Sequence, residues 1–134
     1  MSPFSVAETA DRLEQVIALN PAIQIIARID QSQIATDAGR PAAPIAQLLF
    51  QNSDFVRQIV ERDPEGAFHL PVKALMWEQP TAAGVRVWLR TTDPEDLDRS
   101  DAGPSQLVGD IAAILGAMID RVVDLDDPLT ASEQ

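Results

Sequence analysis

The sequence predicts an α+β domain, a two-layer sandwich in which helices back a largely antiparallel sheet. Three features lead to this class. Residues 22–30 alternate in the manner of a half-buried strand. Residues 72–91 read as two strands joined by a loop, and residues 105–123 carry a long apolar stripe at helical spacing. The expected order of elements is β-α-β-(short α)-β-α-β-β-α, which packs as a sheet with helices on one side.

The first elements follow from capping signals and alternation. Ser5 and Glu8 have the spacing of a capping box, so a helix is expected to begin there and to end at Asn20-Pro21. Residues 2–5 are compatible with a short edge strand before it. The next strand is expected to place two sets of side chains on opposite faces, namely Ile23, Ile25, Ala27 and Ile29 on one and Gln24, Ile26, Arg28 and Asp30 on the other.

Short elements fill the middle of the chain. Residues 32–39 are compatible with one or two helical turns that end at Gly39, and residues 45–50 form a short apolar strand. The segment 52–63 begins with capping residues, carries apolar side chains at helical spacing and stops before Pro64. These elements complete the first half of the sandwich.

The hairpin is predicted with strands over 72–79 and 85–91 and a five-residue loop between them. This loop length places Gln79 opposite Val85. The register then predicts three pairs on one face, which are Met76 with Trp88, Glu78 with Arg86 and Ala74 with Arg90, and it places Trp77 on the other. We expect the helices to cover the Trp77 side.

The last helix, over 105–123, follows a polar connection with room for a single helical turn. Its predicted apolar stripe consists of Leu107, Val108, Ile111, Ile114, Leu115, Met118, Ile119 and Val122. Burial of seven or eight such side chains at about 1.5–3 kcal/mol each is a large favourable contribution before entropy is counted. This helix is therefore expected to cover the sheet.

Composition limits the possible partners. The chain of 134 residues has the size of one domain, and the absence of cysteine excludes disulfides and thiolate metal sites. Its formal net charge is −11, with ten acids against eight bases in residues 1–90 and eleven against two in residues 91–134. This field repels phosphate backbones, so neither nucleic acid nor a membrane is an expected partner.

Domain limits and location are also expectations from the sequence. Residues 1–123 are predicted to form one domain, and residues 124–134 an acidic, flexible tail whose deletion leaves the fold intact. No apolar run approaches the length of about 20 residues that spans a bilayer, and no signal peptide is recognisable. A soluble, cytoplasmic protein is expected.

Four separated motifs resemble one known family. The chain reads "ARIDQSQIA" at 27–35, "LLFQNSD" at 48–54, "FHLPVKALMWEQ" at 68–79 and "LRTTDP" at 89–94. In this order and spacing they are similar to the motifs of the domain of unknown function 302 family, over about residues 3–123. The resemblance implies a compact α+β fold, with a sheet backed by helices, and homodimers. It implies no activity, because none is established for the family.

Several positions depart from the family pattern. The histidine that usually follows the "RID" motif is Gln31 here, and Gln51 and Ser53 replace a glycine and a proline. His69 stands where members usually carry aspartate, so it does not replace the missing histidine at the same place. Any chemistry that depends on the missing histidine is lost in this chain.

Four residues are candidates for ligand binding. Arg28 and Asp30 lie on the less apolar side of their strand, either as an anchor for a ligand or as an ion pair on the strand face. Lys73, the only lysine, either keeps the sheet edge soluble or joins Arg90 in a small anion pocket. The only histidine, His69, is expected in a loop or partly packed at the entrance of a strand.

No motif assigns a catalytic residue, a metal ligand or a cofactor. The chain has no nucleophile elbow, phosphate-binding loop, dinucleotide fingerprint or zinc-protease motif. A single histidine also excludes a pair of histidine ligands or a histidine dyad within one chain. We therefore expect no metal and no cofactor.

One sheet face is predicted to serve association. Its residues are Met76, Trp88, Ile26 and Arg86, and Arg28 and Arg90 flank them. Aromatic and arginine side chains are enriched at interfaces, and monomers seldom leave such a patch open. The alternative is that further helices or loops cover this face.

Three hypotheses about function remain. The first is a non-enzymatic homodimer that binds a small or apolar molecule between sheet and helices. The second is a protein-interaction module that uses the Trp88 face and the acidic C-terminal region. The third is an enzyme of unrecognised type that uses Arg28, Asp30 and Lys73. Ligand, pathway and physiological partner cannot be read from the sequence.

Overall fold

The computed structural model describes residues 1–98 and 106–129. These residues form an antiparallel sheet in the order β1-β2-β3-β4, with each strand paired to the next along the chain. The strands are β1 (Ile23–Asp30), β2 (Ile45–Asn52), β3 (Val72–Thr81) and β4 (Gly84–Thr91). The predicted antiparallel sheet is confirmed.

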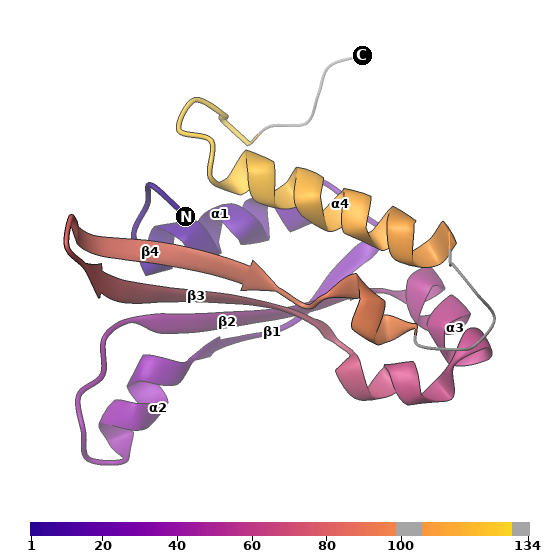
Figure 1. Ribbon diagram of the computed structural model, residues 1–134, viewed down its shortest axis with the longest axis horizontal. Helices are drawn as coiled ribbons and strands as arrows, with labels where there is room; N and C mark the ends of the chain where they lie inside the picture. The colour runs from indigo at the N-terminus through magenta and orange to yellow at the C-terminus, as the bar shows by residue number, and fades with distance from the viewer. Residues whose placement is uncertain (99–105, 130–134) are drawn as a thin grey trace.

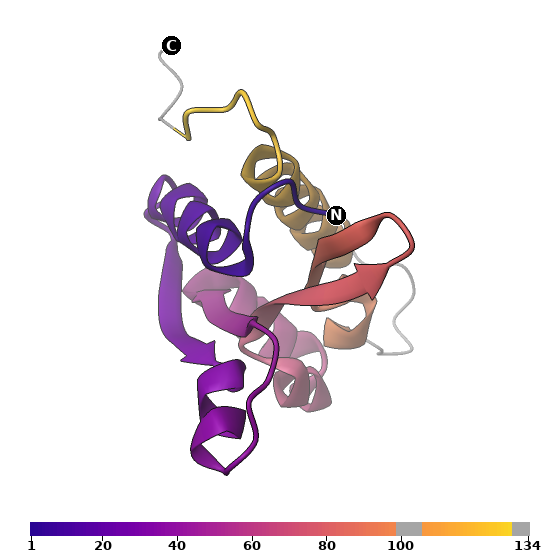
Figure 2. The ribbon, with the colours of Figure 1, turned by 90° about the vertical axis from the view of Figure 1, so that its left-hand side faces the viewer.

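Helices occupy three places around this sheet. α1 (Val6–Ala18) and α4 (Gln106–Val122) lie side by side on one face, as Figures 1 and 2 show. We call this the inner face and the opposite one the outer face. α2 (Gln31–Asp37) lies beside one end of the outer face, and α3 (Ser53–Arg62) and the 3-10 helix η1 (Pro64–His69) lie beside the other (Figure 1). A second 3-10 helix, η2 (Pro94–Leu97), follows β4. The predicted α+β class, with a sheet backed by helices, is confirmed.

Side-chain caps begin the helices where the sequence predicts them. The Ser5 hydroxyl accepts a hydrogen bond of 3.1 Å from the amide of Glu8 at the start of α1. The Asn52 amide oxygen accepts bonds from the amides of Asp54 and Phe55 at the start of α3. Such bonds satisfy backbone donors that have no partner within the helix.

The core lies between the inner face and the two covering helices. Its buried side chains are Val6, Ala10, Leu13, Val16 and Ile17 from α1, Leu107, Ile111, Leu115, Met118 and Val122 from α4, and Ala46, Leu48, Phe50, Val72, Ala74, Met76 and Val87 from the sheet. The predicted stripe of the last helix is thus buried along its centre, whereas Val108, Ile114 and Ile119 at its borders are only half-buried.

The register of the hairpin differs by one residue from the prediction. Thr81 pairs with Gly84, so the turn contains only Ala82 and Ala83, and Trp77 lies opposite Trp88. A shift of one residue moves every side chain of one strand to the other face. Met76 is therefore fully buried on the inner face, and the predicted pair of Met76 and Trp88 does not form.

A bulge in β1 changes the predicted division of its side chains. Ile25 pairs with Phe50 but Ala27 pairs with Leu49, so Ile26 is the extra residue. Paired residues share a face, and Phe50 is in the core. Ile25 therefore points to the inner side and Ala27 to the outer side, although strict alternation places them together.

Both ends of the described chain, at Ser2 and at Leu129, pack against the rest of the domain. The strand expected over residues 2–5 is reduced to one bridge, in which the amide of Ser2 donates to the carbonyl of Val87 at 2.7 Å. The packed chain also extends beyond residue 123, because Leu129 is buried. Within the described residues, no helix is long and apolar enough to cross a membrane. The expected polar connection over 92–104 contains η2, and its residues 99–104 lie outside the described chain.

Candidate binding site on the outer face

A ladder of paired side chains runs along the outer face of the β3–β4 hairpin. Directly opposite residues of antiparallel strands point to the same side. The ladder consists of Leu75 with Arg90, Trp77 with Trp88, and Gln79 with Arg86. Lys73 continues it at one end and is joined to the loop after β4, because its amide donates to the Thr92 hydroxyl at 2.9 Å. A continuous row of apolar and cationic side chains therefore faces away from α1 and α4.

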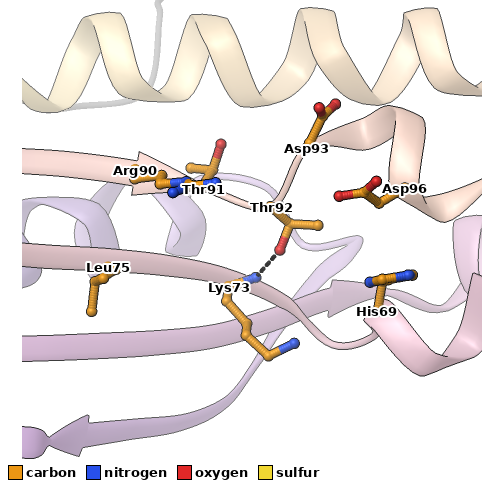
Figure 3. A pocket seen from close by; sticks show the side chains of 8 residues that line it. All are labelled: His69, Lys73, Leu75, Arg90, Thr91, Thr92, Asp93 and Asp96. Atoms are coloured by element: carbon orange, nitrogen blue, oxygen red, sulfur yellow. Dashed lines mark hydrogen bonds between the residues drawn. The ribbon is translucent and has the colours of Figure 1, made fainter.

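A cavity of about 290 Å³ opens at the Lys73 end of this ladder. Its lining residues are His69, Lys73, Leu75, Arg90, Thr91, Thr92, Asp93 and Asp96. Figure 3 shows Lys73 and Leu75 on the side away from α4, whereas Asp93 points toward that helix. The imidazole of His69 and the carboxylate of Asp96 lie at the same end of the cavity (Figure 3).

Close packing between η1 and η2 positions His69 and Asp96 at one end of the cavity. A Cβ atom on Gly66 of η1 would lie 2.2 Å from the carbonyl oxygen of Leu97 in η2. Only glycine fits at this approach. His69 therefore reaches the cavity from η1 and Asp96 from η2, and both also line a neighbouring hollow of about 470 Å³ beside Phe68. The Phe68 side chain is 86% exposed.

The charged groups of the cavity differ in whether they already have a hydrogen-bond or ion-pair partner. Asp93 accepts a hydrogen bond of 3.0 Å from the amide of Glu95, which caps η2, and Asp96 also has an interaction partner. Neither Lys73 nor Arg90 takes part in an ion pair within the described part of the chain. The positive charges of the cavity are thus the ones available to a ligand.

Arg28 and Asp30 lie elsewhere. Arg28 donates to Asp11 at 2.6 Å and to Glu14 at 3.2 Å, both on α1, so the strand residue is tied to the inner-face helix. The hydrogen bond to Asp11 raises the pKa of the Arg28 guanidinium. The structure therefore separates this arginine from Lys73, on the outer face.

Asp30 acts as the cap of α2. Its carboxylate accepts hydrogen bonds from the Ser32 hydroxyl and from the Gln33 amide, and these bonds lower the pKa of the Asp30 carboxyl. Asp30 and Arg28 border a separate hollow of about 120 Å³ between β1 and the start of β2. Of the four predicted ligand-binding residues, only Lys73 and Arg90 share the cavity of about 290 Å³.

The structure also places the four predicted interface residues in different parts of the sheet. Trp88 and Arg86 lie on the outer face, and the Trp88 side chain is 37% exposed. Met76 belongs to the core, because the register differs from the prediction. Ile26 is exposed at the bulge of the edge strand β1, three strands away from Trp88 in the order of the sheet.

Sequence reasoning missed several residues of the site. The predicted register places Trp77 on the helix-covered face, and Thr92, Asp93 and Asp96 fall in the predicted polar connection over 92–104. The sequence carried one usable signal, because Thr92 and Asp93 belong to the last of the four family-like motifs. Among the described residues, no group of three or more histidine, aspartate or glutamate side chains could hold a metal ion.

An antiparallel sheet with α1 and α4 on its inner face and an outer face without a covering helix at its middle defines the class of this protein, a small open-faced α+β domain. The family described as "Domain of unknown function DUF302" matches residues 1–125, so the chain belongs to the DUF302 family. This match confirms the resemblance seen in the four motifs.

A solved structure supports the fold. It is described as the crystal structure of uncharacterized conserved protein DUF302 from Bacillus stearothermophilus. The TM-score is 0.72 at 16% sequence identity, and the match covers 92% of this chain and 94% of that chain. A likeness at this identity shows the shared fold alone. No curated protein matches this chain.

Proposed function

We propose that this domain is a non-enzymatic binding module that holds a small molecule on the outer face of its sheet. The observation that carries the proposal is the cavity of about 290 Å³, whose lining pair Leu75 and Arg90 is followed along the hairpin by the pair Trp77 and Trp88. Sites for small molecules have volumes of about 300–1,000 Å³ and combine apolar walls with a few convergent polar groups. The cavity is at the lower end of this range.

The composition of the walls supports a ligand with both apolar and polar parts. Leu75 provides an apolar floor next to the tryptophan pair, and Lys73 and Arg90 stand on either side of it. His69 and Thr92 add groups that can donate or accept hydrogen bonds. Because β3 and β4 are held by a regular ladder and by the bond from the Lys73 amide to Thr92, the backbone positions of Lys73, Leu75 and Arg90 are set before a ligand binds.

Native mass spectrometry of gently purified protein tests the proposal. We expect a population that carries a defined extra mass, and the released compound should change the tryptophan fluorescence when it is added back. The chain has two tryptophans and no tyrosine, and both tryptophans lie on the outer face, so their emission reports on this surface. Bare protein whose emission also stays constant across a library of small metabolites would contradict the proposal.

A second candidate function is association of two copies through the outer face. The observation that favours it is the exposure of Trp88 beside Trp77 and Ile45, because an aromatic surface of this kind is typical of interfaces. The same mass spectra separate the candidates. A bare dimer favours association alone, and a monomer with a bound compound favours ligand binding alone.

The hypothesis of an enzyme with Arg28, Asp30 and Lys73 receives no support from their placement. Arg28 pairs with Leu48, a residue of the inner face, whereas Lys73 pairs with Leu49 on the outer face. Asp30 is occupied as the cap of α2. We therefore do not propose a reaction for this group of residues.

A further inference from the structure

We infer that the ligand of the outer-face cavity is a small organic anion, with its acidic group between Lys73 and Arg90 and its apolar body on Leu75 and the tryptophan pair. This inference rests on the proposed binding function and names its ligand class. A carboxylate, sulfonate or phosphate group supplies the same chemistry, which is negative charge and oxygen acceptors for ammonium and guanidinium donors.

The distribution of charge over the sheet is the first argument. The chain carries a formal net charge of −11, with 21 acidic residues against 10 basic ones. Yet the outer-face positions of the four strands contain three cationic side chains, Lys73, Arg86 and Arg90, and no aspartate or glutamate. The two carboxylates that line the cavity, Asp93 and Asp96, come from the segment after β4, and Asp93 points toward α4 (Figure 3). On the strands themselves, this surface is therefore the place where an anion meets local positive charge.

The second argument is that most other basic residues already have an ion-pair or hydrogen-bond partner within the protein. Arg28, Arg57, Arg62 and Arg121 form ion pairs, and Arg12 donates to backbone carbonyl groups. Lys73, Arg90, Arg86 and Arg40 form no ion pair in the described chain, although the protein offers a large excess of carboxylates. Of these four, Lys73 and Arg90 line the same cavity, so an anion can approach two cations there without displacing a carboxylate from either.

The neighbours of these cations define the rest of the ligand. Leu75 is paired with Arg90, and the next pair on the same face is Trp77 with Trp88. On the other side of β3, Ile45 pairs with Trp77. An inorganic ion would leave this apolar surface uncovered, whereas a molecule with an aromatic or branched apolar body covers it while its acidic group stays at the cavity.

Two dyes with the same rings provide the test. 8-Anilinonaphthalene-1-sulfonate carries a sulfonate, and N-phenyl-1-naphthylamine lacks it. We expect wild-type protein to bind the sulfonate at least about 10-fold more tightly, because each charge-assisted hydrogen bond contributes about a factor of ten or more. Energy transfer from the tryptophans to the dye would show that the dye is bound to the protein.

The variants Lys73→Gln and Arg90→Gln should each weaken binding of the sulfonate about 10-fold and leave binding of the neutral dye unchanged. Arg40→Gln is the matched control, since it removes the same charge from an exposed position after α2, away from the cavity. Arg40→Gln should change neither affinity. Far-UV circular dichroism checks the fold of all variants. Independently of the variants, the affinity of the wild type for the sulfonate should fall as salt is added.

The outcomes distinguish the ligand class from the proposed function. Equal affinities for both dyes, unchanged in the two variants, would overturn the anionic class and leave small-molecule binding in place. Preference for the sulfonate that survives both substitutions would also overturn the inference, because the anion would then bind elsewhere. Binding of neither dye, together with bare protein in the native mass spectrum, would remove the proposed function itself.

Discussion

A single arginine holds the C-terminal segment on the first helix. The Arg12 Nε donates to the carbonyl oxygen of Val122 at 2.7 Å, and its NH2 group donates to the carbonyls of Asp124 at 2.8 Å and Asp127 at 3.1 Å. The guanidinium also lies 4.2 Å from the centre of the Phe4 ring. The last carbonyls of a helix have no partner within it, so Arg12 supplies donors that α4 itself lacks. Arg12 thereby ties Asp124 and Asp127 to α1.

The same segment predicts a pH dependence of stability. The hydrogen bond from Arg121 lowers the pKa of the Asp127 carboxyl from 3.8 to about 2, and the Leu129 amide adds a second bond. The charged carboxylate therefore stabilises the folded state above about pH 3.8, and this contribution disappears as the pH falls through about 2. We expect Asp127→Asn to lower the free energy of unfolding near neutral pH.

Urea unfolding of wild type and Asp127→Asn from pH 6 down to pH 2 measures this effect. The difference between the two proteins should narrow below about pH 4, and this comparison cancels the titration of the other carboxyl groups. A difference that stays constant over the whole range would show that the Asp127 charge does not contribute.

At the level of elements, the sequence predicted where strands and helices occur but not how β3 and β4 pair. The prediction places Pro80 first in a five-residue loop, whereas Pro80 lies in β3 opposite Val85. The turn has two residues and is followed by Gly84, with φ = +111°. Alternation identifies a strand from its own residues. The register depends on the turn, and an error of one residue moved Met76 and Trp77 to the wrong faces.

The candidate site could be predicted only in part. Lys73 and Arg90 lie on regular strands, and their proximity follows from the hairpin. His69 and Asp96 lie on 3-10 helices, and no periodic pattern in the sequence marks these segments. His69 and Asp96 lie close together only because η1 packs against η2, and a sequence pattern does not show such a tertiary contact.

That contact can be tested at Gly66. In Gly66→Ala the new methyl group would lie 2.2 Å from the carbonyl oxygen of Leu97 and 2.9 Å from the Cγ2 atom of Ile59. One of these atoms belongs to the backbone, so η1 and η2 must move apart. We expect a loss of about 1–3 kcal/mol in the free energy of unfolding, as for other overpacked sites.

Chemical denaturation measures this loss, and Gly109→Ala provides a matched control. A methyl group at Gly109 on the exposed side of α4 would meet nothing within 4 Å. There the substitution should raise stability by up to about 1 kcal/mol, because alanine favours the helix. Equal effects at both positions would contradict a packing role for Gly66.

At the level of the whole molecule, the fold covers one face of the sheet and leaves the other open. α1 and α4 cover the inner face, and within the described chain the middle of the outer face carries no helix (Figures 1 and 2). Trp77, Leu75 and Leu49 on this face are only half-buried, although residues of their size contribute most when fully buried. Monomers seldom leave such an apolar face open, which is why we propose that a ligand or a second copy covers it.

Trp88→Ala separates association from folding. Trp88 lies on the outer face of the edge strand β4 and is not part of the helix-covered core. Removal of its side chain should therefore cost little stability. If two copies associate through this face, the variant should dissociate at concentrations at which the wild type remains dimeric, because aromatic anchors dominate interfaces. Sedimentation velocity at matched concentrations measures the monomer fraction, and urea unfolding measures stability.

Met76→Ala is the contrasting variant on the same hairpin. Met76 is fully buried on the inner face, so its truncation should cost about 2–5 kcal/mol of stability. It leaves the outer surface unchanged, so the folded fraction should associate as the wild type does. Equal monomer fractions in wild type and Trp88→Ala would exclude Trp88 from any interface, and the open face would then be left to a ligand alone.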